Sequence, residues 1–448
     1  MEIIKFKTEG LAQLSYLIID KETAAVIDPR REAKIYYDKA KEQGASIKYI
    51  FETHRNEDFV TGSRELQRHC DAQILHGEGL DFEFGRFVKD NENFILDEIC
   101  FQVLSTPGHT PESISLALYP TRESEQALAV FTGDSLFVND VGRTDFFPDK
   151  RNEYAEMLYD SLHQKILPLG DEVVLYPAHG AGSVCGGKIA DREISTLGFE
   201  KKHNPMLQLS KDEFIKQKAN ETHQKPPYFK EMEKINLKGS DTALINYQHT
   251  KNISREDLKK DFNKFQIIDV RSSEAFLGCH IPGSLSIPQG MLSAYAGYFI
   301  SYDQPIVLVT DTEQEEEQAK AALVNLGYDN ILGALAGGIS AWEVSGESLA
   351  SVRMLDVDHI QNEKSSSTLL DIRNPNEWDE GIIKNARTIF LGDLLRNLNE
   401  FSKDEHLITY CGSGKRATIA ASLLQAHDFK NVSVFMGSMQ AYQNKKAS

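Results

Sequence analysis

The stretch IKYIFETHRNED, residues 47–58, joins an apolar run of strand-forming residues directly to side chains that can bind a metal. Three later stretches repeat this arrangement, namely PGHTPES at 107–113, FTGDS at 131–135 and PAHGAGSVCGGK at 177–188. A strand holds the residues at its end on a rigid edge. His54, His109 and Asp134 together supply two imidazoles and one carboxylate, the ligand set that holds Fe(II) and leaves positions open for oxygen and substrate.

The surrounding residues predict an α/β fold. Up to about residue 200, short β-rich runs alternate with helical stretches such as 33–43 and 153–164, a pattern typical of sheets covered by helices. Residues 200–240 are polar and rich in lysine, which favours a helical extension that ends in an interdomain linker. A plain linker is the alternative.

After residue 250 the chain repeats itself. QIIDVRSSEAF at 266–276 is echoed by TLLDIRNPNEW at 368–378, and GYDNILGALAGGISAW at 327–342 by DFKNVSVFMGSMQAY at 428–442. Each copy predicts a compact α/β unit of about 100 residues. The predicted domains are therefore 1–240, 250–350 and 353–448.

Composition narrows the class of protein. The 448 residues suggest about three domains, and 41% hydrophobic with 26% charged residues is typical of a globular chain. A formal net charge of -18 argues against nucleic-acid binding. With no 18-residue apolar run and no leader peptide, we expect a cytoplasmic protein without a membrane span. The five cysteines are too sparse for a disulfide framework, and the sequence leaves a homo-oligomer open.

The four ligand-bearing stretches resemble the metallo-β-lactamase superfamily, whose first motif is THxHxDH. Here Asn56 and Phe59 stand at the second and last histidine positions, so the second metal site of that family loses a principal ligand. Asp58 and His179 are left without a full set. A binuclear thioester hydrolase of the glyoxalase II type is therefore disfavoured.

Within that superfamily, the order of the motifs is similar to that of persulfide dioxygenases fused to rhodanese domains. The resemblance implies an αββα sandwich followed by two rhodanese-like domains. It also implies one Fe(II) per chain on His54, His109 and Asp134, with zinc possible in a purified sample. The expected reaction oxidises a low-molecular-weight thiol persulfide with O2 to sulfite and thiol, with thiosulfate as product or substrate of the rhodanese half.

Further residues are expected around this centre. Asp58 and His179 should be hydrogen-bond partners of the ligands rather than ligands themselves. Asp28 is either such a partner or a turn residue, and Arg143 supports the pocket through the substrate or the loop. Cys185 is either a thiol that contacts the persulfide or a packed small residue.

The last domain carries HLITYCGSGKRATIAASLLQA at 406–426, an apolar strand that enters a loop from Cys411 to Arg416 and then an alanine-rich helix. Inward N–H groups, the helix N-terminus, Lys415 and Arg416 all favour a thiolate and an anionic persulfide on Cys411. The loop resembles that of sulfurtransferases.

The middle domain departs from this pattern. Thr310 or Asp311 stands at the cysteine position, and the acidic run TEQEEEQAK follows at 312–320. This domain cannot carry sulfur by the rhodanese mechanism, so we expect a spacer and docking surface. A non-catalytic sulfur carrier with a structural metal is the second rival to the dioxygenase.

Overall fold

The computed structural model describes residues 1–8, 10–221, 223, 225–240, 251–362 and 367–447. The chain divides into two compact units, one formed mainly by residues up to 240 and the other mainly by residues from 251 onwards. The linker predicted between 240 and 250 lies outside the described residues.

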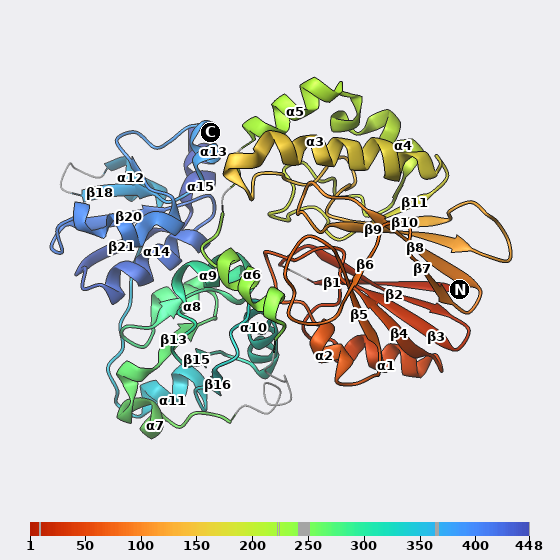
Figure 1. Ribbon diagram of the computed structural model, residues 1–448. Coiled ribbons are helices and arrows are strands. Elements are labelled where there is room, and N and C mark those ends of the chain that lie inside the picture. The colour runs from red at the N-terminus through yellow and green to blue at the C-terminus, as the bar shows by residue number, and fades with distance from the viewer. Residues whose placement is uncertain (9, 222, 224, 241–250, 363–366, 448) are drawn as a thin grey trace. The chain divides into compact units, whose positions relative to one another are not determined.

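The first unit contains two six-stranded sheets, with strand orders β1-β2-β3-β4-β5-β6 and β12-β11-β10-β9-β8-β7 (Figure 1). The strands are β1 (Glu2–Thr8), β2 (Gln13–Asp20), β3 (Thr23–Ile27), β4 (Ser46–Phe51), β5 (Gln73–Gly77), β6 (Arg86–Val88), β7 (Asn93–Leu96), β8 (Ile99–Ser105), β9 (Ile114–Pro120), β10 (Ala129–Gly133), β11 (Val174–Pro177) and β12 (Ser195–Thr196). The helices are α1 (Lys34–Glu42), α2 (Ser63–Gln67), α3 (Arg151–Ser161), α4 (Leu197–His203), α5 (Lys211–Asn220) and α6 (Phe229–Lys238).

These elements form four layers, which confirms the predicted αββα sandwich. Buried side chains from both sheets, such as Leu14, Phe51 and Phe101, pack together as the central core. A second core joins α1 and α2 to the first sheet, and a third joins α3 and α5 to the second sheet (Figure 1). The central strands β2 and β3 are buried along their whole length because each has a neighbour on both of its faces.

The predicted ligand stretches all follow strands. Thr53 and His54 come just after β4, His109 follows β8, Asp134 directly follows β10, and His179 follows β11. The strands β10 and β11 pair in parallel, so their carboxyl ends meet at one edge of the second sheet. This placement brings ligands from both sheets to one end of the sandwich.

The helical extension is part of the first unit rather than a plain linker. The side chain of Asn236 on α6 donates hydrogen bonds to the carbonyls of Asn56, at 2.7 Å, and Phe59, at 2.8 Å. Its Oδ1 accepts from the backbone N–H of Thr61 at 2.9 Å. These bonds fix the backbone of the loop that follows β4.

The second unit holds the predicted repeat as two parallel α/β domains. The first has strand order β14-β13-β15-β16 and the second β17-β21-β20-β18-β19. The elements of the first are α7 (Arg255–Lys260), β13 (Gln266–Asp269), α8 (Ser273–Gly278), β14 (Leu285–Ser286), α9 (Leu292–Phe299), β15 (Ile306–Val309), α10 (Glu313–Asn325), β16 (Ile331–Ala334) and α11 (Gly338–Val344). Those of the second are β17 (Arg353–Leu355), α12 (Val357–Asn362), β18 (Ser367–Asp371), α13 (Pro375–Trp378), β19 (Arg387–Thr388), the 3₁₀ segment η8 (Leu391–Glu400), β20 (His406–Tyr410), α14 (Lys415–Ala426), β21 (Asn431–Phe435) and α15 (Ser438–Ala447).

The repeated DxR motif has the same structure in both copies. Arg271 pairs with Asp269 and donates to the carbonyl of Cys279 at 2.8 Å. Arg373 pairs with Asp371 and donates to the carbonyl of Gly381 at 2.7 Å. In each domain the buried ion pair ties the end of β13 or β18 to the turn that lies eight residues after the arginine.

None of the helices in the described part of the chain is both long and apolar enough to span a bilayer.

Candidate metal centre and sulfur-transfer loop

His54, His109 and Asp134 meet in the interior of the first unit. Asp134 Oδ2 lies 3.6 Å from His54 Nε2 and 3.4 Å from His109 Nε2. All three residues are at most 2% exposed. Two ligands of one ion, each about 2.1 Å from it, lie roughly 3 to 4 Å apart, so these separations suit a shared metal.

A chain of hydrogen bonds orients His54. Asp28 accepts from the backbone N–H of Thr53 and from its hydroxyl, both at 2.7 Å. When Asp28 is ionised, that hydroxyl gives its only proton to Asp28, and its oxygen accepts from His54 Nδ1, 3.0 Å away. His54 therefore carries its proton on Nδ1 and presents the Nε2 lone pair to the centre, which gives Asp28 the supporting role rather than that of a simple turn residue.

Arg143 orients the second histidine through its backbone. His109 Nδ1 donates to the carbonyl of Arg143 at 2.9 Å, which again leaves the Nε2 lone pair free. The buried guanidinium of Arg143 is engaged by Asp145, at 2.6 and 2.9 Å, and by the carbonyl of Val184 at 3.2 Å. These hydrogen bonds tie Arg143 to the loop that carries Asp145 and to the segment around Val184.

His179 links Asp134 to Asp58. Its Nδ1 lies 2.7 Å from Asp134 Oδ1, and its Nε2 lies 3.2 Å from Asp58 Oδ2. Burial lowers the pKa of His179, but the charges of Asp134 and Asp58 outweigh burial and raise it well above the usual value. Phe59, at the lost histidine position, packs edge-on with its ring 6.3 Å from that of His179.

The unpartnered atoms test whether these residues fit a metal. His54 Nε2, His109 Nε2 and Asp134 Oδ2 are buried without a hydrogen-bond partner, although buried polar atoms normally have one. Burial lowers the pKa of His54 to about 3 and that of His109 to about 4, so both rings are neutral, as ligands must be. Two neutral imidazoles and one carboxylate with converging lone pairs fit a single divalent ion.

A buried glutamate beside this trio was not anticipated from the sequence. Glu57 Oε2 is unpartnered and lies 3.9 Å from His109 Nε2, while Glu57 Oε1 accepts from Arg55 at 2.9 Å. Burial, opposed by Arg55, raises the pKa of Glu57 to about 8. Glu112 accepts from the backbone N–H of Arg55 at 2.6 Å and so holds this part of the loop.

Cys185 is buried beside the candidate ligands. Its sulfur is within 4.8 Å of ligand atoms of Asp58 and His179, and also of ligand atoms of His109 and Asp134. Burial raises the pKa of Cys185 well above the usual value. The structure thus assembles a second trio of Asp58, His179 and Cys185 that sequence spacing did not predict.

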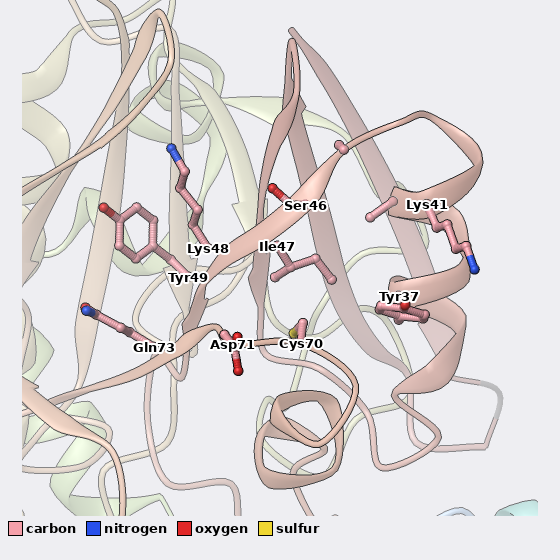
Figure 2. Close-up of a pocket in the computed structure, with 11 residues that line it drawn as sticks. Tyr37, Lys41, Ser46, Ile47, Lys48, Tyr49, Cys70, Asp71 and Gln73 are labelled. Atoms are coloured by element: carbon pink, nitrogen blue, oxygen red, sulfur yellow. The ribbon is translucent and has the colours of Figure 1, made fainter.

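A separate pocket of about 640 Å³ opens between α1, β4 and the residues before β5. Figure 2 shows Tyr37, Lys41 and Tyr49 among the side chains around it, with Cys70 on its wall. None of the candidate ligands lines this pocket.

In the second unit, β20 leads into Cys411 and the loop closes at the start of α14, as predicted. Cys411 is 1% exposed, and its sulfur accepts from the backbone N–H of Gly414 at 3.1 Å. The backbone N–H of Cys411 donates to Ser438 Oγ at 3.1 Å, and that hydroxyl donates to the carbonyl of Phe435 at 2.8 Å. Ser438 is therefore a positioning residue that the motif did not reveal.

The two basic residues of the loop have different surroundings. Arg416 forms two hydrogen bonds to the carboxylate of Glu377, at 2.5 and 2.8 Å, whereas Lys415 is exposed. The Arg416 charge is therefore partly balanced by a residue from α13. Glu377 was not identified from the sequence because it lies 39 positions earlier.

Strand register settles which residue of the middle domain matches Cys411. Asp371 of the last DxR motif pairs with Tyr410, and Asp269 of the first pairs with Val309. Thr310 therefore occupies the cysteine position, and α10 begins there with Glu313, Glu315 and Glu316 in its first turn. This acidic turn replaces the basic end of the Cys411 loop.

Residues 8–179 match the family model of the metallo-β-lactamase superfamily, and residues 254–345 and 356–445 each match the rhodanese-like domain. Persulfide dioxygenase ETHE1 of Bos taurus is 32% identical, across 45% of this chain and 74% of its own. Hydroxyacylglutathione hydrolase GloC of Haemophilus influenzae is also 32% identical, across 42% of this chain and 89% of its own. The crystal structure of a metallo-β-lactamase from Staphylococcus aureus is similar with a TM-score of 0.67 and 32% identity, covering 75% of this chain and 98% of that one.

Proposed function

The chain belongs to the metallo-β-lactamase superfamily through its first domain, which precedes two rhodanese-like domains, and we propose that it is a persulfide dioxygenase coupled to a sulfurtransferase. Homology to persulfide dioxygenases together with the rhodanese-like domains supports a role in sulfur metabolism.

One observation carries the dioxygenase half of the proposal. His54 Nε2, His109 Nε2 and Asp134 Oδ2 converge without partners, and each histidine holds its proton on the opposite nitrogen. Two imidazoles and one carboxylate favour a single ferrous ion with open positions over a closed tetrahedral site.

The proposed reaction is RSSH + O2 + H2O → RSH + SO3²⁻ + 2 H⁺. The outer sulfur of the persulfide is oxidised and O2 is reduced. Fe(II), one ion per chain, supplies the activation of O2 that this oxidation requires, and zinc can replace it in a purified sample. The protein keeps His54 and His109 neutral and oriented, and the buried ring of Phe59 limits access of water.

The sulfur-transfer half rests on Cys411. Its thiolate attacks the sulfane sulfur of thiosulfate, the old S–S bond breaks, and sulfite leaves with the bonding electron pair. The reverse step takes the sulfite formed by the first domain and returns thiosulfate. Carrying both sites on one chain raises the effective concentration of this shared intermediate.

Metal content and oxygen uptake test the proposal. We expect close to one iron per chain in protein purified without oxygen, and oxygen uptake with at least one member of a panel of thiol persulfides. The His109→Ala variant should lose the iron. Full metal retention in that variant, or two tightly bound metals in the wild type, would contradict the assignment.

A thioester hydrolase is the second candidate because of a specific observation. Asp58, His179 and Cys185 present a second set of ligand-type atoms, and a hydrolase is among the relatives that are 32% identical. A charged His179 between Asp58 and Asp134 disfavours a second cation there. Hydrolysis of acyl-glutathione by protein holding two metals would favour this candidate.

A further inference from the structure

The side chain of Glu57 enters the metal centre from the loop that follows β4. Residue 57 falls at the second x of the motif THxHxDH, so the motif assigns no role to it. Glu57 is 0% exposed, and its Oε2 lies 3.9 Å from His109 Nε2. Atoms of Glu57, His54 and His109 that can bind a metal all lie within 4.8 Å of one another. Glu57 therefore lies beside both histidines.

No hydrogen bond within the described part of the chain accounts for the orientation of Glu57 Oε2. The atom is buried without a partner among those residues, and its distance of 3.9 Å from His109 Nε2 is too long for a hydrogen bond. The other carboxylate oxygen, Oε1, accepts from Arg55 at 2.9 Å. An unpaired carboxylate oxygen in the interior is costly, and a cation bound beside it would remove that cost.

Four residues around this point share one arrangement, in which the protein holds one polar atom and leaves the other buried without a hydrogen-bond partner in the described structure. The held atoms are His54 Nδ1 by Thr53, His109 Nδ1 by Arg143, Asp134 Oδ1 by His179 and Glu57 Oε1 by Arg55. The unpartnered atoms are His54 Nε2, His109 Nε2, Asp134 Oδ2 and Glu57 Oε2. Because one oxygen of each carboxylate is engaged, each carboxylate can offer a metal one oxygen.

The two carboxylates approach the same histidine nitrogen. Asp134 Oδ2 lies 3.4 Å from His109 Nε2, and Glu57 Oε2 lies 3.9 Å from it. Both separations are within the roughly 3 to 4 Å that ligands of one ion show. The geometry that supports Asp134 as a ligand therefore supports Glu57 as well.

We propose that Glu57 Oε2 is a fourth protein ligand of the single metal, so that the site consists of two imidazoles and two carboxylates. The inference rests on the single-iron dioxygenase of the proposed function and deepens it. Two carboxylates balance the two positive charges of Fe(II), as a buried ion requires. A six-coordinate ion with four protein ligands keeps two open positions, which suffice for the persulfide sulfur and O2.

Contacts on either side of Glu57 fix its position. Asn236 of α6 donates to the carbonyls of Asn56 and Phe59, which flank it in the loop. Arg55 holds the carboxylate itself through Oε1. The ligand atom is thus oriented by the protein, and little order has to be gained when a metal binds.

The test compares Glu57→Gln with Glu233→Gln in the full-length protein. Both carboxylates pair with Arg55, but Glu57 is the one whose other oxygen lies beside His109. Affinity for Fe(II) or Co(II) is measured without oxygen against a chromogenic chelator. Groups that only orient ligands contribute about 10- to 100-fold to metal affinity, so the loss of a ligand in Glu57→Gln should weaken binding by at least about 100-fold. Glu233→Gln should stay within about twofold of wild type, and equal affinities in the two variants would overturn the proposal.

A second measurement does not depend on the folding of a variant. Infrared difference spectra between Co(II)-loaded and metal-free wild type are recorded with ¹³C at the glutamate carboxylates. A glutamate band should shift when the metal binds, and this band should be lost in Glu57→Gln but kept in Glu233→Gln. Metal-dependent bands in the wild type that are all insensitive to the glutamate label would overturn the role of Glu57.

Failure of the proposed function has a different signature. Nitric oxide, a stand-in for O2, should bind the ferrous wild type and give the electron paramagnetic resonance signal of an iron nitrosyl. If the glutamate band shifts but nitric oxide does not bind, Glu57 is a ligand of a closed site. That outcome supports the fourth ligand and contradicts the dioxygenase.

Discussion

Replacing Asp28 with asparagine should reverse the proton positions that prepare His54 for a metal. The backbone N–H of Thr53 points at Asp28 Oδ1 from 2.7 Å, so the amide oxygen of the introduced asparagine must take that place. Its NH2 group then faces the Thr53 hydroxyl, which becomes an acceptor and turns its own proton toward His54 Nδ1. His54 would carry its proton on Nε2, the atom that faces the centre. The left-handed backbone at Asp28, with φ of 50°, also suits asparagine.

The expected loss follows from the hydrogen bonds that metal binding would break. In the variant, His54 can present its Nε2 lone pair only if its proton moves to Nδ1. This move breaks the hydrogen bond that His54 Nδ1 accepts from the Thr53 hydroxyl, and it disturbs the hydrogen bond from the introduced amide to Thr53. At about 1 kcal/mol for each bond, the cost is about 2 kcal/mol. This corresponds to roughly 30-fold weaker metal binding, within the range of about 10- to 100-fold typical of groups that orient ligands.

The assay is competition for Fe(II) or Co(II) against a chromogenic chelator without oxygen, together with ¹⁵N NMR of the histidine rings. The Thr53→Ser variant is the matched control because it keeps the hydroxyl, and its affinity should stay close to that of the wild type. Unchanged metal affinity in Asp28→Asn, or an Nδ1 proton on His54 in that variant, would refute the reasoning.

Three more outcomes are expected. The Asp134→Ala variant should lose oxygen uptake but keep sulfur transfer by Cys411, because the sites belong to different domains; loss of both in a folded variant would show coupling. Cys411→Ser should still form sulfite from persulfide but no enzyme-dependent thiosulfate, and added sulfur found mainly on Cys185 would contradict this. Burial raises the pKa of Asp28 from 3.8 to about 7, so the folded metal-free protein retains a proton that the unfolded chain releases. Its stability should therefore fall as pH rises from about 4 to about 7, and denaturant titrations should show a weaker fall in Asp28→Asn.

Much of the architecture could be predicted because the signals are local. The alternation of β-rich and helical stretches predicted sheets covered by helices, and the echo of QIIDVR in TLLDIR predicted two similar α/β domains. His54, His109 and Asp134 could be nominated because each follows an apolar strand, and strand ends at one edge of a sandwich come together. Cys411 was equally visible because its whole loop is contiguous.

Several residues of the sites gave no such signal. Three features depend on contacts between distant segments of the chain. They are the side-chain direction of Glu57, the support that Asn236 gives to the loop after β4, and the second trio that includes Cys185. The alternatives for Asp28 could also be separated only by the path through Thr53, because the sequence does not report which hydroxyl meets which carboxylate.

The sequence by itself determined the fold class, the repeat, the absent cysteine in the middle domain and the identity of the candidate ligands, since each depends on residue type and short spacing. Only the tertiary structure decided which nitrogen of His54 and His109 faces the centre, and that Glu377 binds Arg416 of the cysteine loop. Proton positions and such side-chain pairs follow from hydrogen-bond partners far apart in the chain, which are brought together only by packing.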